Sequence, residues 1–110
     1  MPNTAIPRRS NRATFCSYPV RSAAALTDFE AQVRLAFANL EATLKAGGCT
    51  LDDIVDVTTF HTDPENQFET IMKVKAEVFP KAPYPNWTAI GVNWLAGFDF
   101  EIKVIARVPD

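Results

Sequence analysis

The clearest hydrophobic pattern lies near the carboxyl end of the chain. From Phe98 to Ala106 apolar residues occupy every second position, and mostly charged residues, among them Glu101 and Lys103, lie between them. This alternation predicts a strand with one face in a core and one polar face. Residues 84–94 are rich in Trp, Thr, Ile and Val, and residues 95–97 make a short connection. We therefore expect the two segments to pair as a β-hairpin.

Two helices are predicted before that hairpin. Residues 27–30, Thr-Asp-Phe-Glu, are a capping box, in which the Thr27 hydroxyl accepts from a backbone N–H of the first turn and Glu30 reaches back. Apolar side chains then recur at helical spacing, until Gly47-Gly48 ends the helix in a left-handed conformation. These apolar side chains are Phe29, Val33, Phe37, Leu40 and Leu44. Asp63-Pro64 opens the second helix. Its apolar positions include Phe68, Met72 and Phe79, and Pro80 closes it.

The remaining segments complete an α+β pattern. Residues 54–62 are rich in β-branched side chains and apolar on both faces, which predicts a central strand covered on both sides. Residues 13–18 can form only a short or edge strand, because Pro19 follows. This order of elements predicts one mixed β-sheet with two helices packed on one face. Since no third helix remains for the other face, we expect another copy of the chain to cover it.

Composition narrows the function by exclusion. The 110 residues suit one domain at residues 27–110, preceded by an irregular segment at residues 1–26. A net charge of −2 offers no broad attraction to nucleic acid or to anionic membranes, so neither is an expected partner. The absence of a spanning apolar run and of a signal-peptide core predicts a cytoplasmic protein. Cys16 and Cys49 have no histidines at ligand spacing, which favours free thiols over a disulfide or a metal site.

Several stretches of the chain resemble a known family. Residues 32–44, 46–60 and 100–106 look like the RidA/YjgF family, also called the reactive-intermediate deaminase or endoribonuclease L-PSP family. Residues 63–68 and 84–89 are similar to its YjgH-like branch. The resemblance implies a chorismate-mutase-like α+β fold, assembled as a homotrimer with small-molecule clefts between subunits. It also implies hydrolysis of enamines and imines, without a metal or a cofactor.

The resemblance also implies roles for particular residues. Glu101 falls on the family's glutamate that activates or positions water, which makes it the candidate catalytic residue. Asn86 stands where deaminating members carry an arginine that binds the substrate carboxylate, and asparagine cannot supply that charge. Thr88 matches a position that holds Cys, Ser or Thr in many members. Together with Trp87, which could line an apolar cleft, Asn86 and Thr88 form the expected substrate-binding set.

Each of these residues has a structural alternative. Glu101 can be an ordinary polar-face residue, Asn86 a loop cap, and Trp87 and Trp94 core or interface packing. His61, the single histidine, is expected to be structural or solvent-facing. Three function classes remain. They are a hydrolase of enamines, imines or related reactive metabolites, a non-catalytic trimer that binds a small metabolite, and last a ribonuclease, which the missing basic stripe disfavours.

The first residues depart from the resemblance. The family places strands that end in a Ser-Gly pair where this chain has residues 13–22. Back-translated and read one nucleotide away, these residues permit Gly-Asp-Leu-Leu-Phe-Val-Ser-Gly-Gln-Val-Gly, a strand followed by Ser-Gly. We hypothesise that the segment is a frame-shifted translation, with the family frame resuming between Ala23 and Thr27. The expected consequence is a weakened sheet edge and trimer seam, and the alternative is a divergent N-terminus.

Overall fold

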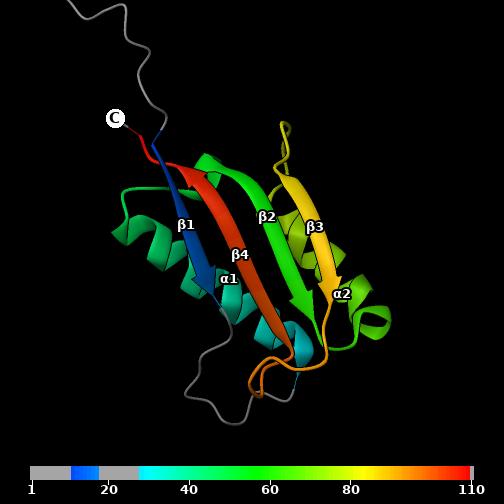
Figure 1. Cartoon of the computed structure of the whole chain (residues 1–110). Helices are drawn as coiled ribbons and strands as arrows, with labels where there is room; N and C mark the ends of the chain where they lie inside the picture. Colours follow the sequence, from blue (N-terminus) through cyan, green and yellow to red (C-terminus); the bar gives the residue numbers. More distant parts are fainter. Residues whose placement is uncertain (1–10, 18–27, 110) are drawn as a thin grey trace, which may run out of the picture.

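The computed structural model describes residues 11–17 and 28–109. Along the chain it contains β1 (Arg12–Ser17), α1 (Phe29–Ala46), a short 3-10 turn η2 (Leu51–Asp53), β2 (Ile54–His61), α2 (Pro64–Val78), β3 (Asn86–Gly91) and β4 (Phe100–Arg107) (Figure 1). Of the predicted irregular segment at 1–26, the structure describes only residues 11–17. Its separation from a domain at 27–110 therefore stays a prediction.

The four strands form one mixed sheet in the order β1-β4-β2-β3. β4 lies between β1 and β2 and is antiparallel to both, whereas β3 runs parallel to β2. The weak strand near residue 13 is therefore an edge strand, as expected, and the strand that begins at Ile54 is central.

The predicted hairpin between the last two strands is wrong. β3 and β4 lie on opposite sides of β2 and do not pair. The reason is that both ends of the connection between them are tied to the end of β2. The Val92 N–H donates to the His61 carbonyl oxygen at 2.9 Å, and the Thr62 N–H donates to the Asp99 carbonyl oxygen at 3.3 Å. The chain therefore crosses the end of β2 instead of turning back on itself.

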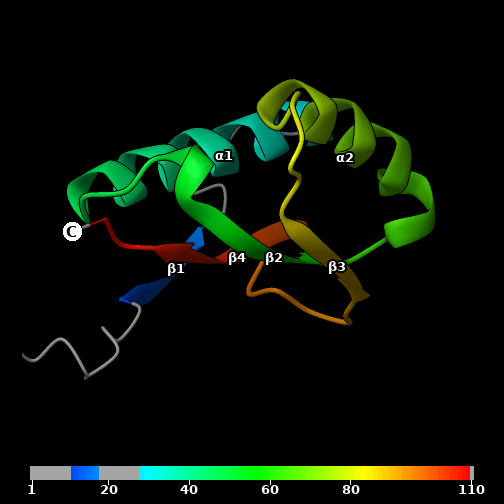
Figure 2. The same ribbon diagram turned by 90° about the horizontal axis from the view of Figure 1, so that it is seen from above.

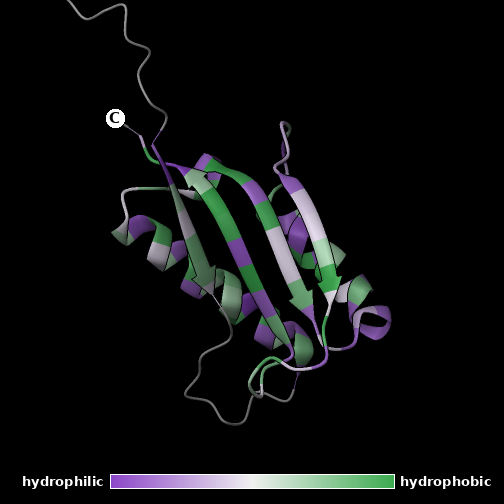
Figure 3. Ribbon diagram, viewed as in Figure 1, coloured by the Kyte–Doolittle hydropathy of each residue, from purple (hydrophilic) through white to green (hydrophobic). Residues whose placement is uncertain are grey.

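Both helices cover the same face of the sheet, which confirms the predicted layers (Figure 2). Phe100, Ile102, Val104 and Ala106 of β4 are fully buried beneath them, while Lys103 between them is exposed. Figure 3 shows this alternation as stripes along β4. No helix of the described residues lies on the opposite side, which we call the open face. We expected β2 to be covered on both faces, but within a single chain the helices cover only one of them.

The ends of α1 depart from the prediction by one residue. Asp28 is the N-cap, and its carboxylate accepts from the Glu30 N–H at 3.3 Å, whereas Thr27 lies outside the described residues. At the other end Gly48, with φ of +84°, takes the left-handed conformation, while Gly47 keeps φ at −89°. The buried face of the helix agrees with the predicted spacing. It consists of Gln32, Val33, Ala36, Phe37, Leu40 and Leu44.

α2 is turned relative to the expectation. Pro64 is its first residue, as predicted, but Phe68 is 55% exposed and the buried apolar side chains are Ile71 and Val74. In the first turns of α2 the buried side chain is instead that of Gln67. Its amide oxygen accepts from the Asp63 N–H at 3.1 Å, and its amide nitrogen donates to the Thr62 hydroxyl at 3.3 Å. Gln67 thus accepts from the backbone N–H of the N-cap residue, which has no partner within the helix.

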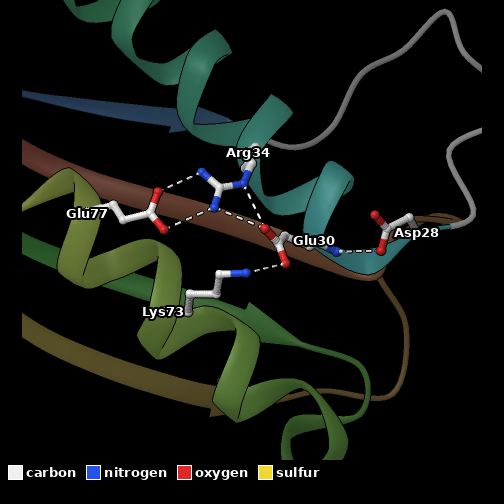
Figure 4. A network of polar contacts seen from close by, with 5 residues as sticks. All are labelled: Asp28, Glu30, Arg34, Lys73 and Glu77. Carbon is white, nitrogen blue, oxygen red and sulfur yellow. Dashed lines mark hydrogen bonds and ion pairs between the residues drawn. The ribbon is translucent and has the colours of Figure 1, made fainter.

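A network of ion pairs joins the two helices on their outer side (Figure 4). The Arg34 guanidinium donates to both carboxylate oxygens of Glu77, at 2.9 and 3.1 Å, and to Glu30 at 3.0 Å. Lys73 donates to the other oxygen of Glu30 at 3.1 Å. The hydrogen bonds from Lys73 and Arg34 lower the pKa of Glu30, and that from Arg34 lowers the pKa of Glu77. Because these groups are in solvent, the network orients the helices more than it stabilises them.

Candidate functional site

The strand registers arrange the side chains of the open face in three rows. The first row is Asn86, Asp56, Ile105 and Thr14; the second is Thr88, Thr58, Lys103 and Cys16; the third is Ile90, Phe60 and Glu101. Asn86, Thr88 and Glu101, three of the expected site residues, therefore share the open face. Trp87 does not, because successive side chains of a strand point to opposite faces.

Glu101 is nevertheless separated from the other two residues within one chain. β2 stands between β3, which carries Asn86 and Thr88, and β4, which carries Glu101. Ordinary strand spacing and rise put the Cα atom of Glu101 about 12 Å from that of Thr88 and about 16 Å from that of Asn86. A molecule the size of an amino acid cannot contact Glu101 and Asn86 of the same chain at once.

Glu101 itself is half-buried on the open face, beside Phe60 of β2. In the part of the chain that the structure describes, its carboxylate has no hydrogen-bond or ion-pair partner. A carboxylate with no protein partner is available to accept a proton from water.

Asn86 is the first residue of β3 and not a loop cap. Its side-chain amide donates to a carboxylate oxygen of Asp56 at 2.9 Å. An acidic side chain therefore lies beside the position at which the family resemblance expects an arginine. Sequence reasoning missed Asp56, because only the parallel register of β2 and β3 brings the two residues together.

Trp87 faces the helices, in agreement with its structural alternative. Its indole N–H donates to the Thr59 hydroxyl at 3.1 Å. Its ring contacts Phe37 and Phe79, with centroid distances of 6.5 and 5.9 Å. The residue thus belongs to the aromatic core on the helix side, and the structure does not bring it together with Asn86 and Thr88.

His61 is buried on the same side as Trp87, so the solvent-facing alternative is wrong. Only 3% of the residue is exposed, and its ring lies 5.5 Å from that of Phe100. Its Nε2 atom is 2.8 Å from the Thr59 hydroxyl, whereas Nδ1 has no partner among the described residues. Burial lowers the pKa of the imidazole, which favours its neutral form.

The two cysteines are free thiols in different surroundings. Cys16 is exposed on the open face, whereas Cys49 is buried, and desolvation followed by the nearby Asp53 charge raises the pKa of the Cys49 thiol. Among residues 11–17 and 28–109, no three His, Cys, Asp or Glu side chains are grouped so that they could hold a metal ion. The metal-free, cofactor-free site stays a prediction. No helix in the described part of the chain is long and apolar enough to cross a bilayer.

Comparison with known proteins identifies the family. The sequence model of the family described as Endoribonuclease L-PSP matches residues 12–108. The chain belongs to this family. It is 76% identical over 83 residues to the RutC family protein YjgH of Escherichia coli (strain K12). That alignment covers 76% of this chain and 63% of the relative, so the chain spans less than two thirds of that relative's length.

Solved structures of similar proteins agree with the fold. A structure described as protein YJGH superposes with a TM-score of 0.86 at 62% identity, covering 94% of this chain and 81% of that one. A crystal structure of E. coli TdcF with bound serine superposes with a TM-score of 0.79 at 30% identity, covering 93% and 84% of the two chains. The resemblance to the RidA/YjgF family and to its YjgH-like branch is thereby confirmed.

Proposed function

We propose that this L-PSP family member acts as a homotrimer with small-molecule clefts between its subunits. In each cleft Glu101 of one copy would face Asn86 and Thr88 of the next copy. The separation of about 12 to 16 Å between these residues within one chain carries the proposal. All three lie on the open face, where Phe60, Ile90 and Ile105 also leave apolar surface for a second copy to bury.

The reaction that we propose is hydrolysis of a small imine, or of an enamine after its protonation to the imine. Glu101 takes a proton from water while the water oxygen bonds to the imine carbon and the C=N electron pair moves to nitrogen. Glu101 then returns the proton to nitrogen, which gives a carbinolamine. The C–N bond breaks with its electron pair leaving on nitrogen, and the hydroxyl proton passes to that nitrogen through Glu101, so that a carbonyl compound and an amine or ammonia are released. The step consumes one water and needs neither a metal nor a cofactor. We propose the cytoplasm as its location.

The polar groups around Asn86 favour a substrate without a carboxylate. The Asn86 amide is held by Asp56, and it lacks the charged, forked donor that binds a carboxylate in two places. The Asp56 charge repels an anion at the same point. We therefore expect neutral or cationic imines to be the better substrates and 2-aminoacrylate to be a poor one.

The test is turnover of imines generated in the assay. The protein should hydrolyse an uncharged imine, and Glu101→Gln should slow this by about 100-fold or more, the usual contribution of a general base. Lys45→Gln, a change on the outer surface of α1, is the matched control and should keep the parent rate. Asn86→Arg should raise activity on 2-aminoacrylate. Equal rates for Glu101→Gln and the parent would refute the catalytic role.

A second candidate function is binding of a small metabolite without turnover. The relative TdcF has been crystallised with bound serine, and a cleft that lost its charged anchor could still bind a ligand. Saturable binding with no hydrolysis of any imine would favour this function. The ribonuclease ranks last, because the net charge is −2. Sedimentation tests the assembly separately, since a stable monomer at micromolar concentration would contradict the proposed trimer.

A further inference from the structure

A cavity of about 340 Å³ lies on the helix side of the sheet, away from the open face. α2 and the residue that follows it supply one wall, from positions that share a helical stripe. The loop that leads to β3 supplies the other. The lining residues are Met72, Lys75, Ala76, Phe79, Pro80 and Tyr84. The wall is therefore apolar and aromatic, with Lys75 as its only charged group and no acidic side chain.

Lys75 is an unusual residue for such a wall. The residue is half-buried, and its Nζ atom lies 5.1 Å from the centroid of the Trp87 ring. The ion pairs of the described residues join Arg34 and Lys73 to carboxylates, and none of them includes Lys75. An ammonium group that rests on an aromatic face keeps its charge and its donors available for an anion.

We propose that this cavity binds a small aromatic carboxylate. The carboxylate accepts from Lys75 Nζ, and the ring of the ligand packs against Met72, Phe79 and the outer wall formed by Tyr84. A volume of about 340 Å³ is at the small end of the range for ligand pockets and suits a single-ring acid. The site is independent of the proposed hydrolase, because Glu101 and Asn86 lie on the opposite face of the sheet.

Trp87 provides the signal for a direct test. The chain has two tryptophans, so Trp94→Phe leaves Trp87 as the only one. In this background the full chain is titrated with phenylacetate, and with phenylacetamide as its neutral isostere, while Trp87 fluorescence is recorded. We expect a saturable change with phenylacetate and binding of phenylacetamide that is about tenfold weaker, as loss of one charge-assisted contact implies.

Substitutions locate the ligand. Lys75→Met should weaken phenylacetate binding about tenfold, while Lys45→Met, the control on α1, should leave it unchanged. Tyr84→Ala removes the outer wall from an exposed loop position and should weaken both ligands alike. Circular dichroism checks the fold of each variant. Equal binding of acid and amide, unchanged affinity in folded Lys75→Met, or loss of binding in Glu101→Gln would overturn the proposal.

Discussion

The two tryptophans allow a sharp test of how the sheet is oriented. Trp87 faces the helices and donates its indole N–H to the Thr59 hydroxyl, whereas Trp94 lies in the connection before β4 and is 75% exposed. Replacing each with phenylalanine keeps an aromatic ring and removes the N–H. We expect Trp87→Phe to destabilise the fold and Trp94→Phe to leave its stability within about 0.5 kcal/mol of the parent.

The size of the effect follows from the contacts of Trp87. Loss of its hydrogen bond to Thr59 costs about 1 kcal/mol. The smaller ring also leaves part of the surface of Phe37 and Phe79 uncovered, and about 40 Å² of apolar area corresponds to about 1 kcal/mol. The sum is about 2 kcal/mol, which lowers the urea midpoint by about 1 to 2 M for a chain of this size.

Urea unfolding followed by far-ultraviolet circular dichroism measures this difference. All variants are compared at one protein concentration, because assembly makes apparent stability depend on concentration. A Trp87→Phe midpoint equal to the parent midpoint would refute the core position of Trp87. If Trp87→Phe kept the parent midpoint but lost imine hydrolysis, Trp87 would be a substrate-binding residue, as first expected from the sequence.

Three further predictions concern stability. Since burial lowers the pKa of His61, the unfolded chain binds its proton more readily, so stability should fall as pH drops below about 6.5 and should fall less in His61→Gln. Gly47→Ala should loosen β1, because a Cβ atom there would lie 2.9 Å from the Phe15 ring, whereas Gly48→Ala should cost about 1 to 2 kcal/mol through its positive φ alone; thermal unfolding compares the two. Arg34→Gln should lower the urea midpoint only at low salt, with the difference vanishing in about 1 M NaCl.

Local periodicity was enough to predict the elements. The alternation along β4 and the helical spacing behind Phe29 each specify which face is buried, and both agree with the structure. The layers followed from the same pattern, because β4 is apolar on one face and mostly polar on the other, which favours helices on a single side. The partner of β3 could not be predicted in this way. Residues 86–91 suit pairing with either neighbour, and the hydrogen bonds that hold Val92 and Asp99 at the end of β2 are long-range.

The candidate site was predictable only in part. Glu101, Asn86 and Thr88 could be assigned to one face from alternation, but their distances depend on β2 lying between them. Trp87 was grouped with Asn86 and Thr88, but it stands between them in β3, so its side chain points to the opposite face of the sheet. Asp56 carried no signal in the sequence, since its importance comes from a hydrogen bond to a residue 30 positions away.

The comparisons bear on the frame-shift hypothesis. The alignment to YjgH spans 83 residues and, at 76% identity, contains about 63 identities. Superposition on the structure described as YJGH extends over about 103 residues and, at 62% identity, contains about 64. The number of identical residues is therefore nearly the same in the two comparisons, although the superposition is about 20 residues longer. Both a displaced reading frame and a divergent N-terminus agree with these counts, so the frame shift stays a prediction.

The strand β1 supplies the physical test of that hypothesis. Its core-facing Ser17 is 6% exposed and donates its hydroxyl to the Ala36 carbonyl oxygen at 2.8 Å, a polar contact within a buried layer. The displaced frame would put leucine at position 15 and phenylalanine at position 17. We predict that a chain carrying the displaced-frame segment at positions 13–23 is more stable by about 2 kcal/mol, the gain from burying one large apolar side chain. Urea unfolding measures this gain. Coding DNA whose displaced codons give no apolar strand ending in Ser-Gly would rule the hypothesis out, and so would a restored chain no more stable than the parent.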